Sequence, residues 1–151
     1  MSSRKIIFHS LQFRVFANAT EDENKVIKAL QFVTGTEQFR RSVTLGYHGN
    51  PKTIFESTLN RSHEINSFFV RWRLEDLERV LETLSVRIDE NGFIFFRFDK
   101  QEAFYERLIL SEGEDVIAVK GKIMAYPSTW DRAVEVAREY FTQLIEVKRI
   151  S

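Results

Sequence analysis

The alternation of apolar and polar residues predicts a first β-strand between Ser10 and Ala19. Its odd positions are apolar and its even positions are polar, except that Phe16 falls on the polar side. A period of two is typical of a strand with one buried face. The next four residues, Thr20-Glu21-Asp22-Glu23, have the form of a capping box and predict a helix that starts at Thr20 and ends at Gly35. This helix should bury an apolar stripe: Val26, Ile27, Leu30 and Val33.

Two further alternating segments, Phe39–Leu45 and Thr53–Leu59, predict a β-hairpin. The segment between them, Gly46–Pro51, is rich in Gly, Asn and Pro, which are turn residues. Helical spacing of apolar residues follows from Ile65 to Leu84, and a break is expected near Arg73.

The most aromatic segment, Phe93–Phe98, reads as a strand that is apolar on both faces, which predicts a central position in the sheet. The Asn91-Gly92 turn before it predicts a hairpin with Val86 and Ile88. Leu108 and Leu110, followed by the apolar positions of 117–123, predict another hairpin around Gly113. A last helix should be capped by Ser128-Thr129-Trp130-Asp131 and bury one face: Trp130, Ala133, Val134, Ala137, Phe141 and Leu144.

Most links between the expected strands are too short for parallel crossovers. The sequence therefore predicts an α+β fold, with a largely antiparallel sheet and helices packed on one face. A length of 151 residues and the lack of long linkers or repeats predict a single domain over residues 1–151.

Composition narrows the possible functions. The 22 Lys and Arg balance the 22 Asp and Glu, so any contact with nucleic acid must come from a local basic patch. The chain has no Cys, and His9, His48 and His63 lack the spacing of a metal pair, so we expect no metal site and no cofactor. No apolar run is long enough to span a bilayer, and we expect a cytoplasmic protein without membrane contact.

Three polar clusters interrupt the apolar pattern: Ala17–Glu21, Gly46–Pro51 and Arg97–Gln101. The simplest interpretation of the second is a tight turn, although Tyr47 and His48 at its tip could stack on a nucleobase. The third has two interpretations: a strand end capped by Asp99, or a site where Lys100 meets a phosphate and Gln101 a base edge or sugar. Acid–base work by Asp99 and Lys100 would require a shifted pKa.

Basic residues also gather locally. If Arg14, Arg40, Lys120 and Lys122 shared one face of the sheet, they would form a track for phosphates. The sequence leaves open whether their strands are neighbours.

At the three polar clusters the chain resembles a family of small, mainly archaeal proteins described as predicted exosome subunits or RNA-binding proteins. The matching stretches are Phe16–Asp22, Gly46–Pro51 and Arg97–Gln101. The resemblance implies a fold similar to that of ribosomal protein L5 and a role in RNA binding. The family usually has His at the positions of Asn18 and Tyr47, and more often Leu at that of Phe98. Loss of the two imidazoles favours RNA contact over catalysis or metal binding.

We therefore expect a non-enzymatic RNA-binding protein linked to RNA processing, the exosome or the ribosome, with no catalytic residues. The candidate RNA contacts are Asn18, Tyr47, His48, Asn50, Lys52, Arg97, Asp99, Lys100 and Gln101. One alternative is a protein–protein interaction module or homodimeric subunit, marked by an exposed patch containing Phe16 or Phe104 and Tyr105. A third interpretation, a hydrolase or nuclease, lacks a visible metal-ligand set or nucleophile–base pair.

Overall fold

The computed structural model describes residues 6–45 and 49–151. Its contacts divide the chain into two compact units. The long-helix unit comprises the residues up to Leu11, Asn60–Phe96 and Lys120–Ser151, and the hairpin unit comprises Gln12–Leu59 and Arg97–Val119. The expectation of a single domain stays a prediction.

The five strands form one antiparallel sheet in the order β2-β3-β1-β5-β4, which confirms the α+β fold class. Strand β1 (Phe8–Ala17) alternates as the sequence predicts, with Leu11, Phe13 and Val15 buried and Phe16 exposed. Strand β5 (Val116–Ile123) likewise buries its odd positions.

The central position predicted for β4 (Phe93–Asp99) is wrong, because this strand lies at the edge of the sheet. Ile94, Phe96 and Phe98 are buried, whereas Phe95 on the opposite face is 41% exposed. The strand was expected to be buried on both faces because its two faces are about equally aromatic. The two faces of β4 differ in burial, although they are similar in hydrophobicity.

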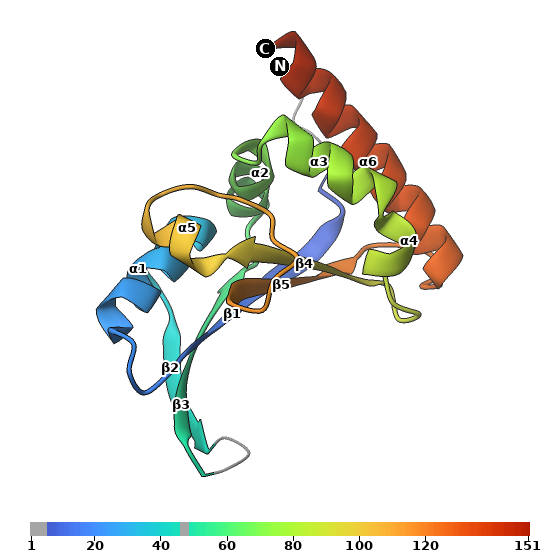
Figure 1. Cartoon of the computed structure of the whole chain (residues 1–151). Coiled ribbons are helices and arrows are strands. Elements are labelled where there is room, and N and C mark those ends of the chain that lie inside the picture. Colours follow the sequence, from blue (N-terminus) through green and yellow to red (C-terminus); the bar gives the residue numbers. More distant parts are fainter. Residues whose placement is uncertain (1–5, 46–48) are drawn as a thin grey trace. The chain divides into compact units, whose positions relative to one another are not determined.

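The long-helix unit packs an aromatic core between its helices and its strands. Helix α2 (Ser62–Val70) ends before Arg73, whose extended backbone starts α3 (Leu74–Glu82), so the predicted break is confirmed. Helix α3 lies beside α6 (Trp130–Ile150) (Figure 1). The core contains close ring pairs, and the ring centroids of Trp72 and Phe96 are 4.9 Å apart.

Three expectations for the long-helix unit need correction. Val86 belongs to a short helix, α4 (Leu84–Arg87), and only Ile88 bridges to Ile94 beside the Asn91-Gly92 turn. The cap of α6 is Thr129, whose side chain accepts a hydrogen bond from the Arg132 amide. Trp130 is 38% exposed, because it is the first residue of α6 and lies at the end of the buried stripe.

In the hairpin unit, α1 (Glu23–Thr34) is capped by Asp22 and not by Thr20. The Asp22 carboxylate accepts a hydrogen bond of 2.9 Å from the Asn24 amide. Gly35 ends the helix with a φ of 77°, as predicted, in the left-handed conformation that glycine adopts readily. Helix α1 lies beside α5 (Lys100–Phe104).

The predicted β-hairpin forms in this unit from β2 (Arg40–Leu45) and β3 (Pro51–Leu59), which pair antiparallel. The half-buried alternation expected for β2 is wrong, because all six of its residues are exposed. Residues 108–110 form no strand either, since only Leu110 makes a bridge, to Phe98.

Candidate nucleic-acid interface

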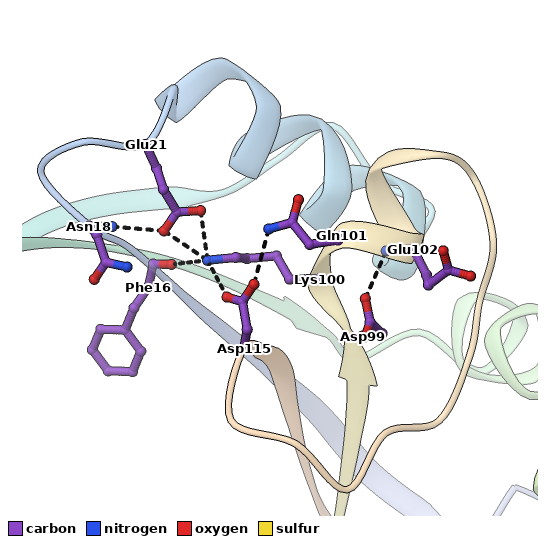
Figure 2. Close-up of polar contacts among 8 residues, drawn as sticks. All are labelled: Phe16, Asn18, Glu21, Asp99, Lys100, Gln101, Glu102 and Asp115. Carbon is purple, nitrogen blue, oxygen red and sulfur yellow. Dashed lines mark hydrogen bonds and ion pairs between the residues drawn. The ribbon is translucent and has the colours of Figure 1, made fainter.

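The third polar cluster is built around a buried lysine. Lys100 is 4% exposed. Its Nζ lies 2.9 Å from a carboxylate oxygen of Glu21 and 2.7 Å from Oδ1 of Asp115. The same ammonium group donates a hydrogen bond of 3.1 Å to the main-chain carbonyl of Phe16 (Figure 2). Three segments of the hairpin unit therefore meet at one buried positive charge, which we call the Lys100 network.

The end of β4 places Lys100 in this position. The chain leaves the strand at Asp99, whose carboxylate accepts a hydrogen bond of 2.8 Å from the Glu102 amide and caps α5. Lys100 is the first residue of that helix, and its amide donates to the carbonyl of Asp115. Of the two roles considered for Asp99, the structure shows capping of the turn.

Gln101 completes the network from the same helix. Its Nε2 donates a hydrogen bond of 3.0 Å to Oδ2 of Asp115. Burial tends to raise the pKa of Asp115, but the hydrogen bonds from Lys100 and Gln101 and the charge of Lys100 outweigh it and lower that pKa. Asp115 therefore stays a carboxylate and holds both neighbouring side chains.

The first polar cluster joins this network through Glu21. Besides contacting Lys100, Glu21 Oε1 accepts a hydrogen bond of 3.0 Å from the Asn18 amide, and its own amide donates to the Asn18 carbonyl. These paired bonds close the turn between β1 and α1, and Figure 2 shows the one that the Glu21 carboxylate accepts from the Asn18 amide. The structure thus brings the first and third clusters together, and the side chain of Asn18 lies on the exposed side of the turn.

Phe16 has its main chain in the network and its ring outside it. The carbonyl accepts from Lys100, while the side chain is on the exposed face of β1 and the residue is 42% exposed. Lys52 Nζ, at the start of β3, lies 5.9 Å from the centroid of this ring. A cation over an aromatic face is attracted by the negative face of the ring. The start of β3, just after the second cluster, therefore approaches the first cluster.

The same face of the hairpin unit carries two arginines that share one carboxylate. Arg14 and Arg40 lie 2.9 and 3.6 Å from the oxygens of Glu56. Arg40 is directly opposite Glu56 in the β2–β3 register. We call this surface the outer face of the hairpin unit, defined by Arg14, Phe16, Arg40, Lys52 and Glu56. It carries an excess of positive charge in a chain with no net charge.

A shallow groove extends this face. Its volume is about 460 Å³, and it is lined by Arg40 and Glu56 together with mostly polar neighbours: Gln12, Phe13, Gln38, Phe39, Ser57 and Thr58. On the other side of the hairpin, Arg41 forms a pair of hydrogen bonds with Glu23 that lowers the pKa of that carboxyl. The charge of Arg41 is therefore balanced by Glu23, whereas Arg14 and Arg40 share the single negative charge of Glu56.

Two further predicted site residues, Arg97 and Asn50, lie at the surface. Arg97 is exposed and donates to the Gly113 carbonyl at 3.3 Å. Asn50 is exposed beside β3. Tyr47 and His48 lie outside the described residues, so their predicted base contacts stay predictions.

Two members of the network, Glu21 and Asp115, were not among the predicted site residues. Glu21 belongs to the first polar cluster, but the capping box there predicts that its carboxylate lies at the start of a helix. Asp115 has no local signal, since it lies in an acidic loop typical of solvated surface. Phe16 did carry a signal, because it breaks the alternation of β1.

The structure supplies no competing metal centre within residues 6–45 and 49–151, where no group of three or more His, Asp or Glu side chains is arranged to hold an ion. None of the helices in the described part of the chain is both long and apolar enough to cross a membrane.

Comparison with known proteins identifies the family. A family model described as RNA binding matches residues 10–123, which include all three polar clusters. The chain belongs to this RNA-binding family. Its relatives include the RNA-binding protein PAB1135 of Pyrococcus abyssi, which is 34% identical over 146 residues and is matched over 90% of this chain and 95% of its own length.

Solved structures of similar sequence share this fold. Mth689, a DUF54 protein from Methanothermobacter thermautotrophicus, is 33% identical, with a TM-score of 0.77 over 90% of this chain and 99% of the other. Protein AF2318 from Archaeglobus fulgidus, also assigned to DUF54, is 34% identical, with a TM-score of 0.77 over 88% and 99% of the two chains. The RNA-binding and archaeal parts of the predicted resemblance are thus confirmed. The exosome and the fold of ribosomal protein L5 stay predictions.

Proposed function

We propose that this protein is a non-enzymatic RNA-binding protein whose hairpin unit contacts RNA through its outer face. The observation that supports this most directly is the arrangement of Phe16, with its main chain fixed by buried Lys100 and its ring exposed beneath Lys52. An aromatic ring on a rigid strand can stack on a base of any sequence. A neighbouring lysine can then neutralise the adjoining phosphate.

The arginines of the outer face extend this contact. Glu56 is shared between Arg14 and Arg40, so one of the two charges is not balanced within the group. RNA phosphates would compete with Glu56 for both guanidinium groups, which bind phosphate through two parallel hydrogen bonds. Because the whole chain has no net charge, affinity would depend on this local excess and would fall as salt is added.

Lys100 takes a different role from the one expected. Its ammonium group is buried and contacts two carboxylates and a carbonyl, so a phosphate could reach it only by displacing these partners. We therefore assign Lys100, Asp99 and Gln101 to holding the RNA-binding surface in shape. Lys52 and Arg97 remain candidates for phosphate contact, and Asn18, Asn50, Tyr47 and His48 for contact with bases.

Binding of short RNA by fluorescence anisotropy tests this proposal. Labelled single-stranded and hairpin RNAs would be titrated at about 50 and about 200 mM salt, a range over which phosphate contacts weaken markedly. Phe16→Ala should weaken binding about tenfold through loss of one stacked base. Lys52→Ala should weaken it several-fold and reduce the slope of log K against log salt by about one.

Matched controls come from residues elsewhere. Tyr105→Ala removes another exposed ring, and Lys28→Ala removes another exposed lysine that lies near a ring, and neither belongs to the outer face. Both controls should bind RNA as the native chain does. Absence of RNA binding by the native protein, or equal losses in the controls and in the two test variants, would refute the proposal.

Association with an RNA-processing assembly, the exosome or the ribosome is part of the proposal and rests on the family resemblance alone. It predicts that tagged protein recovered from cells of its source carries RNA-processing or ribosomal proteins that nuclease treatment does not release. Recovery of the protein alone would leave RNA binding in place and remove this part of the proposal.

A second candidate function is the interaction module or homodimer. The observation in its favour is the Phe104–Tyr105 pair, whose ring centroids are 5.0 Å apart and whose Tyr105 is 62% exposed. Lys25 and Lys28 lie 5.3 and 5.7 Å from the Phe104 centroid, so this patch is partly covered by charge. Light scattering of the native chain and of Tyr105→Ala tests it, since a mass that is monomeric for both would count against a homodimer.

A further inference from the structure

A second cluster of aromatic and basic side chains lies in the long-helix unit, on the exposed faces of β4 and β5. Lys120 Nζ is 4.3 Å from the ring centroid of Phe93 and 5.9 Å from that of Phe95. Lys122 Nζ is 5.0 Å from the Phe93 centroid. It donates a hydrogen bond of 2.9 Å to the Ser128 hydroxyl and another hydrogen bond to the Asn91 carbonyl. We call these two rings and two lysines the β4–β5 platform.

The fold does not require an aromatic residue at Phe95. The opposite side of β4 supplies the core through Ile94 and Phe96, and Phe96 packs on Trp72. Phe95 contributes little to that core, since it is 41% exposed on an edge strand. A polar or β-branched residue would suit an exposed strand position as well.

Lysines that lie over rings provide one explanation for this arrangement. A cation–π contact offsets part of the cost of an exposed ring, and two phenylalanines would then simply be shielded from water. The contacts that hold the lysines are nevertheless easily exchanged, because those of Lys120 are the two rings and those of Lys122 are a ring, a hydroxyl and a carbonyl. The two ammonium groups make the charge of the platform positive, and the Phe95 ring beside them is exposed.

We propose that the β4–β5 platform binds bases of single-stranded RNA, with Phe95 as the main stacking surface and Lys120 and Lys122 contacting the flanking phosphates. This inference rests on the proposed RNA-binding function and adds a second contact to it. A base can replace an ammonium group on a ring face, and the long lysine side chain then reaches the backbone of the same strand. A polyanion fits the charge of the platform, whereas a purely apolar partner would leave both ammonium groups without a counterion.

The surface beside Lys122 leaves room for a bound RNA strand to extend beyond the platform. An open depression of about 350 Å³ adjoins this lysine, lined by His9, Met124, Tyr126 and Ser128 among others. Tyr126 is 93% exposed and offers another ring. Bases of a duplex are already stacked and paired, so the platform should prefer single strands to double-stranded RNA.

Substitutions on β4 and β5 test this inference with defined probes. A labelled 12-nucleotide oligouridylate, the matching DNA strand and a 12-base-pair RNA duplex would be titrated against native protein, Phe95→Ala, Phe95→Thr and Lys120→Ala. Loss of one stacked base predicts about tenfold weaker binding of the oligouridylate by both Phe95 variants. Binding of the duplex should change less than twofold, and Phe95→Tyr should restore single-strand affinity.

Two further measurements keep the result interpretable. Thermal unfolding shows whether Phe95→Ala is folded, and Phe95→Thr retains a residue suited to strands if it is not. Ultraviolet crosslinking of native protein to the oligouridylate, mapped by mass spectrometry, should place a crosslink in the peptide that contains Phe93 and Phe95. Equal loss on DNA and RNA would mean that stacking alone, without the ribose hydroxyl, carries the contact.

The result that would overturn the inference differs from the one that would overturn the proposed function. Native affinity in both Phe95 variants and no crosslink at β4, together with weaker binding by Phe16→Ala, would exclude the platform and leave RNA binding at the hairpin unit intact. Absence of binding by the native protein to every probe would remove both proposals.

Discussion

Lys100 in the hairpin unit and Lys120 in the long-helix unit have opposite surroundings, although each lies near an aromatic strand. Lys100 is buried and contacts Glu21, Asp115 and the Phe16 carbonyl. Lys120 is half-buried over two rings. The charge of Lys100 is paired inside the protein and holds segments together, whereas the charge of Lys120, over an exposed ring, stays available for a ligand. Three predictions test this difference.

The largest expected effect is that of Lys100→Met on stability. This change keeps the apolar stem but removes the charge shared by Glu21 and Asp115, and it leaves the Phe16 carbonyl without its donor. Breaking a buried pair costs about 3–5 kcal/mol, and because Asp115 is partly exposed we expect about 2–4 kcal/mol of lost unfolding free energy. Urea denaturation measures it. A loss below about 0.5 kcal/mol would show that the network does not stabilise the fold.

A smaller effect is expected from the pH dependence of Asp115. Its pKa in the folded chain lies below the ordinary value of 3.8, so the folded state binds fewer protons than the unfolded state. The stabilisation is therefore complete above that ordinary value and is lost as the pH falls through the lowered pKa. Asp115→Asn should cost at most about 1 kcal/mol at neutral pH, because the side chain is 57% exposed.

Unfolding of both proteins from neutral pH down to below 3.8 checks this prediction. The difference in stability between native protein and Asp115→Asn should be constant at neutral and mildly acidic pH and should shrink at the acid end. A difference that grows on acidification would mean that Asp115 is not held as a carboxylate by Lys100 and Gln101.

The smallest effect on stability is expected for Lys120→Ala. Loss of exposed cation–π contacts should cost about 0.5–1 kcal/mol or less. The same variant should nevertheless weaken binding of single-stranded RNA and reduce its salt dependence. Lys100→Met should show the reverse pattern, with a large loss of stability and an unchanged salt slope where the protein is folded. Equal patterns in the two variants would remove the distinction between the two lysines.

Much of the fold was predictable because hydrophobic periodicity records burial directly. The alternation of β1, the hairpin of β2 and β3 and the break at Arg73 all follow from it. The edge position of β4 did not follow, because exposed phenylalanines covered by lysines have the same hydropathy as buried ones. The alternation of apolar and polar residues in β2 also did not predict that every residue of this strand is exposed.

The candidate site was predictable only in part. The Arg97–Gln101 cluster was found from its polarity, but the burial of Lys100 depends on Glu21 and Asp115. Glu21 is 79 positions from Lys100 in the sequence, and Asp115 is 14 positions from Gln101. Such partners leave no local pattern. Polarity thus identified the positions, and only tertiary contacts separated the residues that hold the surface from those that face solvent.

The fixed carbonyl of Phe16 has a consequence for the entropy of binding. Because the hydrogen bond from Lys100 holds the backbone at this residue, a ligand that stacks on the ring would need to restrict only the two side-chain torsions. An aromatic residue on a loop would lose backbone freedom as well, at about 1–2 kcal/mol for each residue ordered. The buried lysine would therefore strengthen a contact that it never touches, by ordering the surface before the ligand arrives.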